Sequence, residues 1–178
     1  MKNFVIGILL TLFVLPLHAQ ELKPPRLVKT AIGASGCSAY LPAGMPEFEQ
    51  SKSEDDADVY TSEIALDSFV FGCIAVKFAA PFTDSKSDEL EDLLIAYMDY
   101  LQGAFEITGA TGYGRGHTLE AYPDARGVLD YWEDDEGNQF AVMGWIDKSH
   151  LGFLYIGGGR EYPIQGTKEM YLKGWRFE

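Results

Sequence analysis

The alternation of apolar and polar positions is clearest over residues 127–158, where three apolar runs are separated by two short polar stretches. The first separator ends in Gly137, which can adopt a positive φ, and the second is the polar stretch 147–150. We predict a strand in each apolar run, over residues 127–133, 139–146 and 151–156. A three-stranded antiparallel meander of this kind is stable once one of its faces is covered.

A second period, typical of a helix, follows in residues 86–105. Apolar side chains recur there at spacings of three and four, which marks one buried face: Leu90, Leu93, Leu94, Tyr97, Met98, Leu101 and Phe105. A shorter helix is predicted over residues 164–173, ended by Gly174. The long helix is amphipathic, so we expect it to lie across a sheet.

The N-terminal half adds further strand candidates, at residues 37–41, 59–66 and 69–79. Residues 27–32 are either a short strand or part of a loose arm. The whole pattern predicts an α+β fold: an α/β/α sandwich with an antiparallel sheet, the long helix at about 86–105 and the short C-terminal helix at about 164–173.

Residues 1–19 have the pattern of a signal peptide. Lys2 precedes an apolar run over residues 4–17, and Ala19 is a small residue suited to cleavage before Gln20. The alternative is a membrane anchor, but a span needs about 20 apolar residues. We therefore expect an exported protein, periplasmic or extracellular, with cleavage near Ala19 and no membrane span in the mature chain.

The expected organisation is a signal peptide over 1–19, an N-terminal arm over 20–36 and a single domain over 37–178. Without its leader the chain has 159 residues, with 13 basic and 27 acidic side chains and a formal charge of −14. That charge opposes binding to nucleic acid and to anionic membrane surfaces. We therefore expect the binding partner to be a protein.

The mature chain has two cysteines, Cys37 and Cys73. Because an exported protein meets an oxidising compartment, we predict a disulfide between them, which would close a loop of about 37 residues and stabilise the fold by about 4 kcal/mol. The alternative is a catalytic thiol, which needs a base, and the mature chain has only His117 and His150.

No catalytic or cofactor motif is evident in the sequence. A small hydrolase using His117 stays an alternative, because triad members can be distant in sequence. The acidic stretch 54–58 leaves open a metal-binding module, although it lacks the spacing of a calcium loop. The remaining candidates are aromatic: Tyr131, Trp132 and Trp145 could form a binding surface, since neighbours in a strand point to opposite faces. We therefore assign no catalytic, cofactor or metal residues.

The order of elements, ending in Tyr171-Leu172-Lys173-Gly174-Trp175, resembles the Mog1/PsbP-like superfamily over residues 37–177. The resemblance implies an α/β/α sandwich and a role that is mostly non-catalytic, such as binding a partner or assisting its assembly. The expected function is a secreted, non-enzymatic binding or accessory domain. The hydrolase and the metal-binding module are the alternatives.

Overall fold

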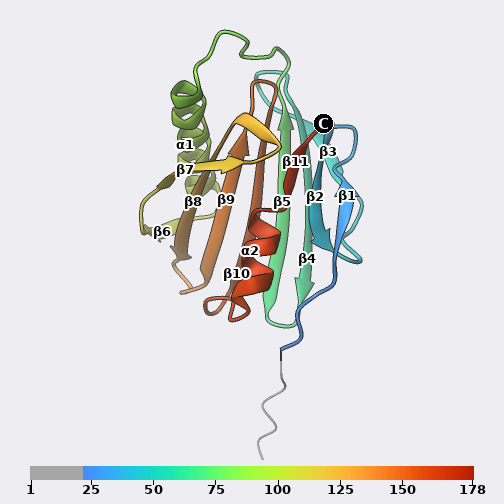
Figure 1. The fold of residues 1–178 in the computed structure, drawn as a ribbon. Coiled ribbons are helices and arrows are strands. Elements are labelled where there is room, and N and C mark those ends of the chain that lie inside the picture. The colour runs from blue at the N-terminus through green and yellow to red at the C-terminus, as the bar shows by residue number, and fades with distance from the viewer. Residues whose placement is uncertain (1–21) are drawn as a thin grey trace, which may run out of the picture.

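The computed structural model describes residues 22–178, and the predicted leader over residues 1–19 lies outside this part of the chain. Of the described residues, 48% lie in strands and 17% in helices. Figure 1 shows the elements, which in chain order are β1 (Leu27–Ala31), β2 (Cys37–Pro42), β3 (Glu49–Lys52), β4 (Asp58–Leu66), β5 (Phe69–Lys77), α1 (Ser87–Ala104), β6 (Ile107–Ala110), β7 (Gly114–Leu119), β8 (Tyr122–Asp134), β9 (Gln139–Ile146), β10 (His150–Gly158), α2 (Gln165–Leu172) and β11 (Trp175–Phe177).

The strands form two antiparallel sheets. The larger sheet has eight strands in the order β3-β4-β5-β10-β9-β8-β6, with β7 also paired to β8. The smaller sheet has the order β1-β2-β11, so the first strands of the domain pair with the last one. The predicted meander is confirmed as β8, β9 and β10, which lie side by side in the larger sheet.

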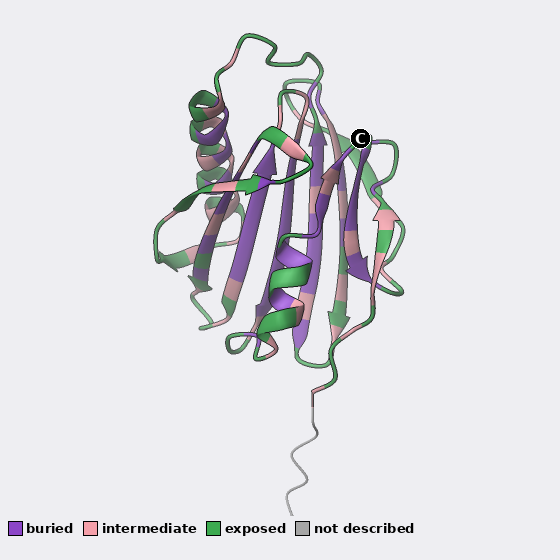
Figure 2. Cartoon of the chain, viewed as in Figure 1, coloured by how far each residue is buried: buried purple, intermediate pink, exposed green. Residues whose placement is uncertain are grey.

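The larger sheet is covered on both faces, and each face has its own core. Helix α1 packs on one face against β8 and β9. Helix α2 and the smaller sheet cover the other face. Figure 2 shows that the central strands are buried and that the buried side of α2 faces the sheet.

Strand β9 shows why a sheet covered on both faces follows from this sequence. Ala141, Met143 and Trp145 belong to the core under α2 and the smaller sheet. Val142 and Ile146 belong to the core under α1. Because successive side chains of a strand point to opposite faces, a run that is apolar at nearly every position requires a cover on each side.

The apolar stripe of α1 is buried as its spacing predicts. Leu90, Leu94 and Met98 are fully buried against the sheet. Gly144 in β9 leaves the space for this contact, since a Cβ there would lie 2.7 Å from Cδ1 of Leu94. The close approach of helix and strand therefore depends on the absent side chain.

The predicted fold class, an α/β/α sandwich, is wrong, because the protein is β-rich and much of one face is covered by a second sheet. The two helices lie near their predicted positions, but they do not form two complete outer layers. Part of the predicted N-terminal arm is strand β1, at the edge of the smaller sheet. Periodicity marks strands in a sequence, but it does not say which strands pair.

The C-terminal segment is fastened to the larger sheet by three contacts. The indole of Trp175 lies over Gly152, where a Cβ would be only 2.1 Å from the ring. The Nε1 of Trp145 donates to the carbonyl of Leu172 at 2.9 Å, and the hydroxyl of Tyr171 donates to the carbonyl of Gly72 at 2.7 Å.

We predict that Gly152→Ala lowers the free energy of unfolding by about 2–3 kcal/mol, because the new methyl group displaces a buried indole. Urea denaturation measures this change. The control is Gly103→Ala in α1, where a Cβ meets nothing within 4 Å. That substitution should stabilise the protein by about 0.5–1 kcal/mol through helix propensity. Equal effects of the two substitutions would contradict the packing of Trp175 on Gly152.

Candidate functional site

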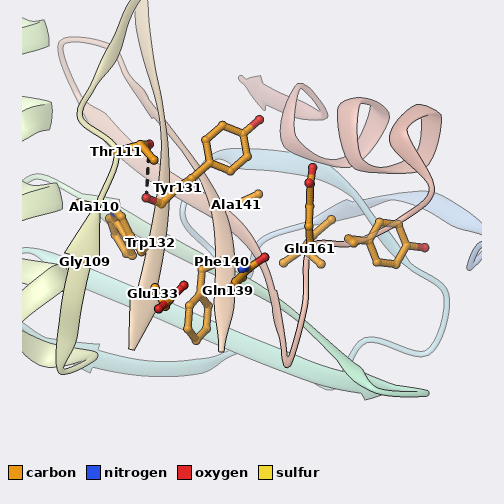
Figure 3. A pocket seen from close by; sticks show the side chains of 12 residues that line it. Gly109, Ala110, Thr111, Tyr131, Trp132, Glu133, Gln139, Phe140, Ala141 and Glu161 are labelled. Atoms are coloured by element: carbon orange, nitrogen blue, oxygen red, sulfur yellow. Dashed lines mark hydrogen bonds between the residues drawn. The ribbon is translucent and has the colours of Figure 1, made fainter. Parts of the chain in front are cut away.

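A groove of about 530 Å³ lies on the larger sheet beside α2 (Figure 3). Its walls come from β6, β8, β9, the end of β10 and the turn before α2. It is lined by Gly109, Ala110, Thr111, Tyr131, Trp132, Glu133, Gln139, Phe140, Ala141, Ile156, Glu161 and Tyr162. Figure 3 shows Tyr131 and Glu161 on opposite sides of Ala141. We refer to this site as the Tyr131 groove.

Tyr131 is the exposed aromatic of the groove, with 39% of its surface accessible. The Nζ of Lys168, from α2, lies 5.2 Å from the centre of its ring, in cation–π geometry. The same Nζ donates to Oε1 of Glu161 at 2.7 Å. Hydrogen bonds from Lys168 and from Gln165 lower the pKa of Glu161, so this carboxylate is charged at neutral pH.

These contacts hold the groove in one shape before anything binds. The side chain of Lys168 is only 6% exposed, and its ammonium group lies between the ring of Tyr131 and the carboxylate of Glu161. An aromatic side chain that is held in place loses little conformational entropy on binding. The geometry is therefore that of a preformed contact surface.

A buried carboxylate holds the strand beneath the groove. Asp130 is 0% exposed and accepts hydrogen bonds from Nε1 of Trp132 at 2.8 Å and from the backbone N–H of Tyr131 at 2.8 Å. Its Oδ1 also accepts from the hydroxyl of Thr111 at 3.2 Å. Asp130 thus ties the end of β6 to β8 and fixes three lining residues of the groove, Thr111, Tyr131 and Trp132.

The charge of the groove is negative. Glu161 neutralises Lys168, whereas Glu133 is exposed and forms no ion pair within residues 22–178. The adjoining β8–β9 hairpin adds Asp135 and Glu136, both exposed. A ligand with positive charge would therefore meet a favourable potential, and an anionic ligand would be repelled.

The three predicted surface aromatics have different positions. Trp132 and Trp145 are buried, at 2% and 1% exposure, on the α1 side and the α2 side of the sheet respectively. As exposed binding residues, these two predictions are wrong, since the sheet is covered on both faces. Tyr131 is exposed and lies in the groove. Sequence reasoning missed Asp130 and Lys168; an acidic residue inside an apolar strand was the available signal for Asp130.

Cys37 and Cys73 are separate free thiols in this structure, both buried in the core between the two sheets. Burial, and next the charge of Asp147, raise the pKa of Cys37 to about 12. Burial also raises the pKa of Cys73. Neither thiol is therefore an activated nucleophile at neutral pH, and the disulfide stays a prediction for the oxidised protein.

The two histidines do not form a catalytic triad. His117 is half-buried on β7, and within the described chain it makes no hydrogen bond to a carboxylate or to a serine. His150 lies 3.2 Å from Oδ1 of Asp147 through its Nδ1. The side chain of His150 is only 13% exposed.

Between residues 22 and 178, no group of three or more His, Cys, Asp and Glu side chains is placed to hold a metal ion. In the same residues no helix has the length and apolar character to cross a membrane. No known protein family and no curated protein matches the chain.

We predict that Asp130→Ala lowers the free energy of unfolding by about 2–4 kcal/mol, because it leaves the buried indole N–H of Trp132 and the partly buried backbone N–H of Tyr131 without an acceptor. Urea denaturation is the measurement. Asp135→Ala, an exposed acid of the neighbouring hairpin, should change it by less than about 0.5 kcal/mol. A loss for Asp130→Ala no larger than that of the control would refute the role of the buried carboxylate.

For the reduced protein we predict that both thiols react with a disulfide reagent only after unfolding, because burial keeps them protonated and inaccessible. The measurement compares the reaction rate with and without urea. Native protein reacting as fast as unfolded protein would contradict the burial. The predicted disulfide is tested on exported protein that is unfolded without reduction. If the disulfide forms, thiol titration should detect no free thiol, and two free thiols per chain would refute the prediction.

Proposed function

We propose that this chain is an exported, non-enzymatic binding domain whose Tyr131 groove recognises a positively charged, extended segment of a partner protein. The observation that carries the proposal is the exposed ring of Tyr131, held beneath the ammonium group of Lys168 at the wall of a 530 Å³ groove. Exposed aromatic side chains that are fixed in position are typical of the centres of binding surfaces.

The charge distribution supports a cationic segment as the ligand. Glu133 is exposed at the groove and unpaired among the described residues, and Asp135 and Glu136 lie on the hairpin beside it. A Lys or Arg side chain of a partner can approach Glu133 while its neighbours contact the ring of Tyr131. Charge complementarity of this kind adds specificity and speeds association.

The backbone of β6 supports an extended segment. β6 pairs with β8 and is the last strand of the larger sheet in the described chain, and its residues Gly109 and Ala110 line the groove. An edge strand offers N–H and C=O groups to which an incoming strand can add. The segment would then run along β6 with alternate side chains facing Tyr131 and Glu133.

Export rests on the leader pattern of residues 1–19, and a non-catalytic role agrees with the Mog1/PsbP-like resemblance. Both belong to the proposal. The alternatives, a hydrolase based on His117 and an acidic-loop metal module, have no specific contact in their favour among residues 22–178. The binding domain is therefore the function that the geometry supports best.

Site-specific photo-crosslinking in the native host tests the proposal. A photoreactive phenylalanine derivative replaces Tyr131 in one variant and Tyr100 in the control variant. Tyr100 is 73% exposed on α1, on the other face of the sheet. We predict a discrete adduct with one protein from position 131 and none with that protein from position 100.

The cross-linked protein is then purified and its affinity measured. Tyr131→Ala and Glu133→Lys should each weaken binding at least about tenfold, through lost aromatic contact and through charge repulsion. Adducts of the same protein from both positions would contradict the proposal, as would an affinity that neither substitution changes.

A further inference from the structure

A second cleft, of about 740 Å³, lies at the other end of α2. One wall is formed by β7 and the turn into β8, and the other by the end of α2 and by β11. In Figure 1 the β7–β8 hairpin crosses in front of the larger sheet beside β11. The buried ring of Trp145 lies at its base, where its Nε1 donates to the carbonyl of Leu172. We refer to this site as the Lys173 cleft.

Two cationic side chains on one wall of the cleft have no counterion. Lys173 and Arg176 both line it, and neither has a carboxylate oxygen within 4.0 Å in the described part of the chain. Other basic residues of the described chain, such as Arg126 and Arg160, also lack an acidic partner, so the feature that marks this cleft is the placement of two such cations on one wall. Lys29, Lys52, Arg115 and Lys168 are the lysine and arginine residues of the described chain that do have a carboxylate partner.

The guanidinium of Arg176 is held in a fixed orientation. Its Nη1 donates to the carbonyls of Lys173 and Trp175. Its planar group lies over the ring of Tyr40, 5.5 Å from the ring centre. Nε and Nη2 of Arg176 form no hydrogen bond within residues 22–178, so they remain available to a ligand. An arginine fixed in this way loses little entropy when it binds an oxyanion.

The opposite wall adds neutral donors. His117 lines the cleft together with Thr118 and Tyr122, two residues whose side chains carry hydroxyl groups. Burial, followed by the positive charge of Lys173, lowers the pKa of His117, while Glu91 opposes this effect. The positive charge of Lys173 therefore acts on the imidazole of His117 across the cleft. Glu120 is the one acidic residue of the lining, and it is exposed at the turn between the two strands.

We propose that the Lys173 cleft binds a small oxyanion of the carboxylate or phosphate type, held by Lys173 and Arg176 on one wall and by His117 on the other. Charge-assisted hydrogen bonds to such a group are about twice as strong as those between neutral partners. The cleft is distinct from the Tyr131 groove, which attracts the opposite charge, so each site can be occupied without the other.

The test is NMR titration of the full chain with inorganic phosphate and, separately, with acetate, at constant ionic strength and pH. The readout is the imidazole resonance of His117. His150, paired with Asp147, serves as the internal reference. We expect a saturable shift of His117 with at least one probe, and a much smaller shift of His150. No saturable shift of His117 with either probe overturns the proposal.

Variants assign the site. Lys173→Ala combined with Arg176→Ala should weaken the affinity for the responding anion at least about tenfold, equivalent to 1.4 kcal/mol. Lys173→Ala alone, at an exposed position, should give a smaller loss and guards against misfolding of the double variant. The matched control is Arg160→Ala, an exposed arginine that lines neither cavity. Unchanged affinity in the double variant, or an equal loss in the control, overturns the proposal.

Discussion

The contact of Trp175 with Gly152 is the constraint on which the rest of the structure depends. The indole occupies the space of an absent side chain, so closely that a Cβ would lie 2.1 Å from the ring. Because β11 pairs with β2, this contact fastens the smaller sheet to the larger one. The hydrogen bonds of Trp145 and Tyr171 then hold α2 on the same face. Without this segment the apolar residues of that face would meet water.

Both candidate sites use the C-terminal segment as a wall. The first half of α2 supplies Lys168 to the Tyr131 groove, and the residues after α2 supply Lys173 and Arg176 to the second cleft. The two sites therefore lie at opposite ends of one short helix, and they have opposite charge. A structural element that closes the core thus also places the polar groups that would contact ligands.

The sequence predicted local structure better than architecture. The period of the apolar residues located both helices and the meander, because that period depends on local geometry. The pairing of the first strands with the last one depends on contacts over the whole chain, and no local pattern contains it. This is why the second sheet was missed and the class of fold was wrong.

The candidate site was predictable in part for a related reason. Alternation placed Tyr131 and Trp132 on opposite faces, but it could not say which face is covered, and both faces are. Lys168 was missed because a lysine on a short helix is usually solvated, whereas here Glu161 and Tyr131 keep it buried. Burial of a charge depends on its partners, which only the folded chain reveals.

The most direct test of the account is the proton chemical shift of the α-protons of Gly152. If the indole of Trp175 lies over this glycine, the aromatic ring current must displace at least one of the two resonances far upfield of the range for a glycine in a strand. Replacing Trp175 with leucine must abolish the displacement. Ordinary shifts for both protons in the unmodified chain would mean that the C-terminal segment is not docked there, and would contradict both the fold and the sites built on it.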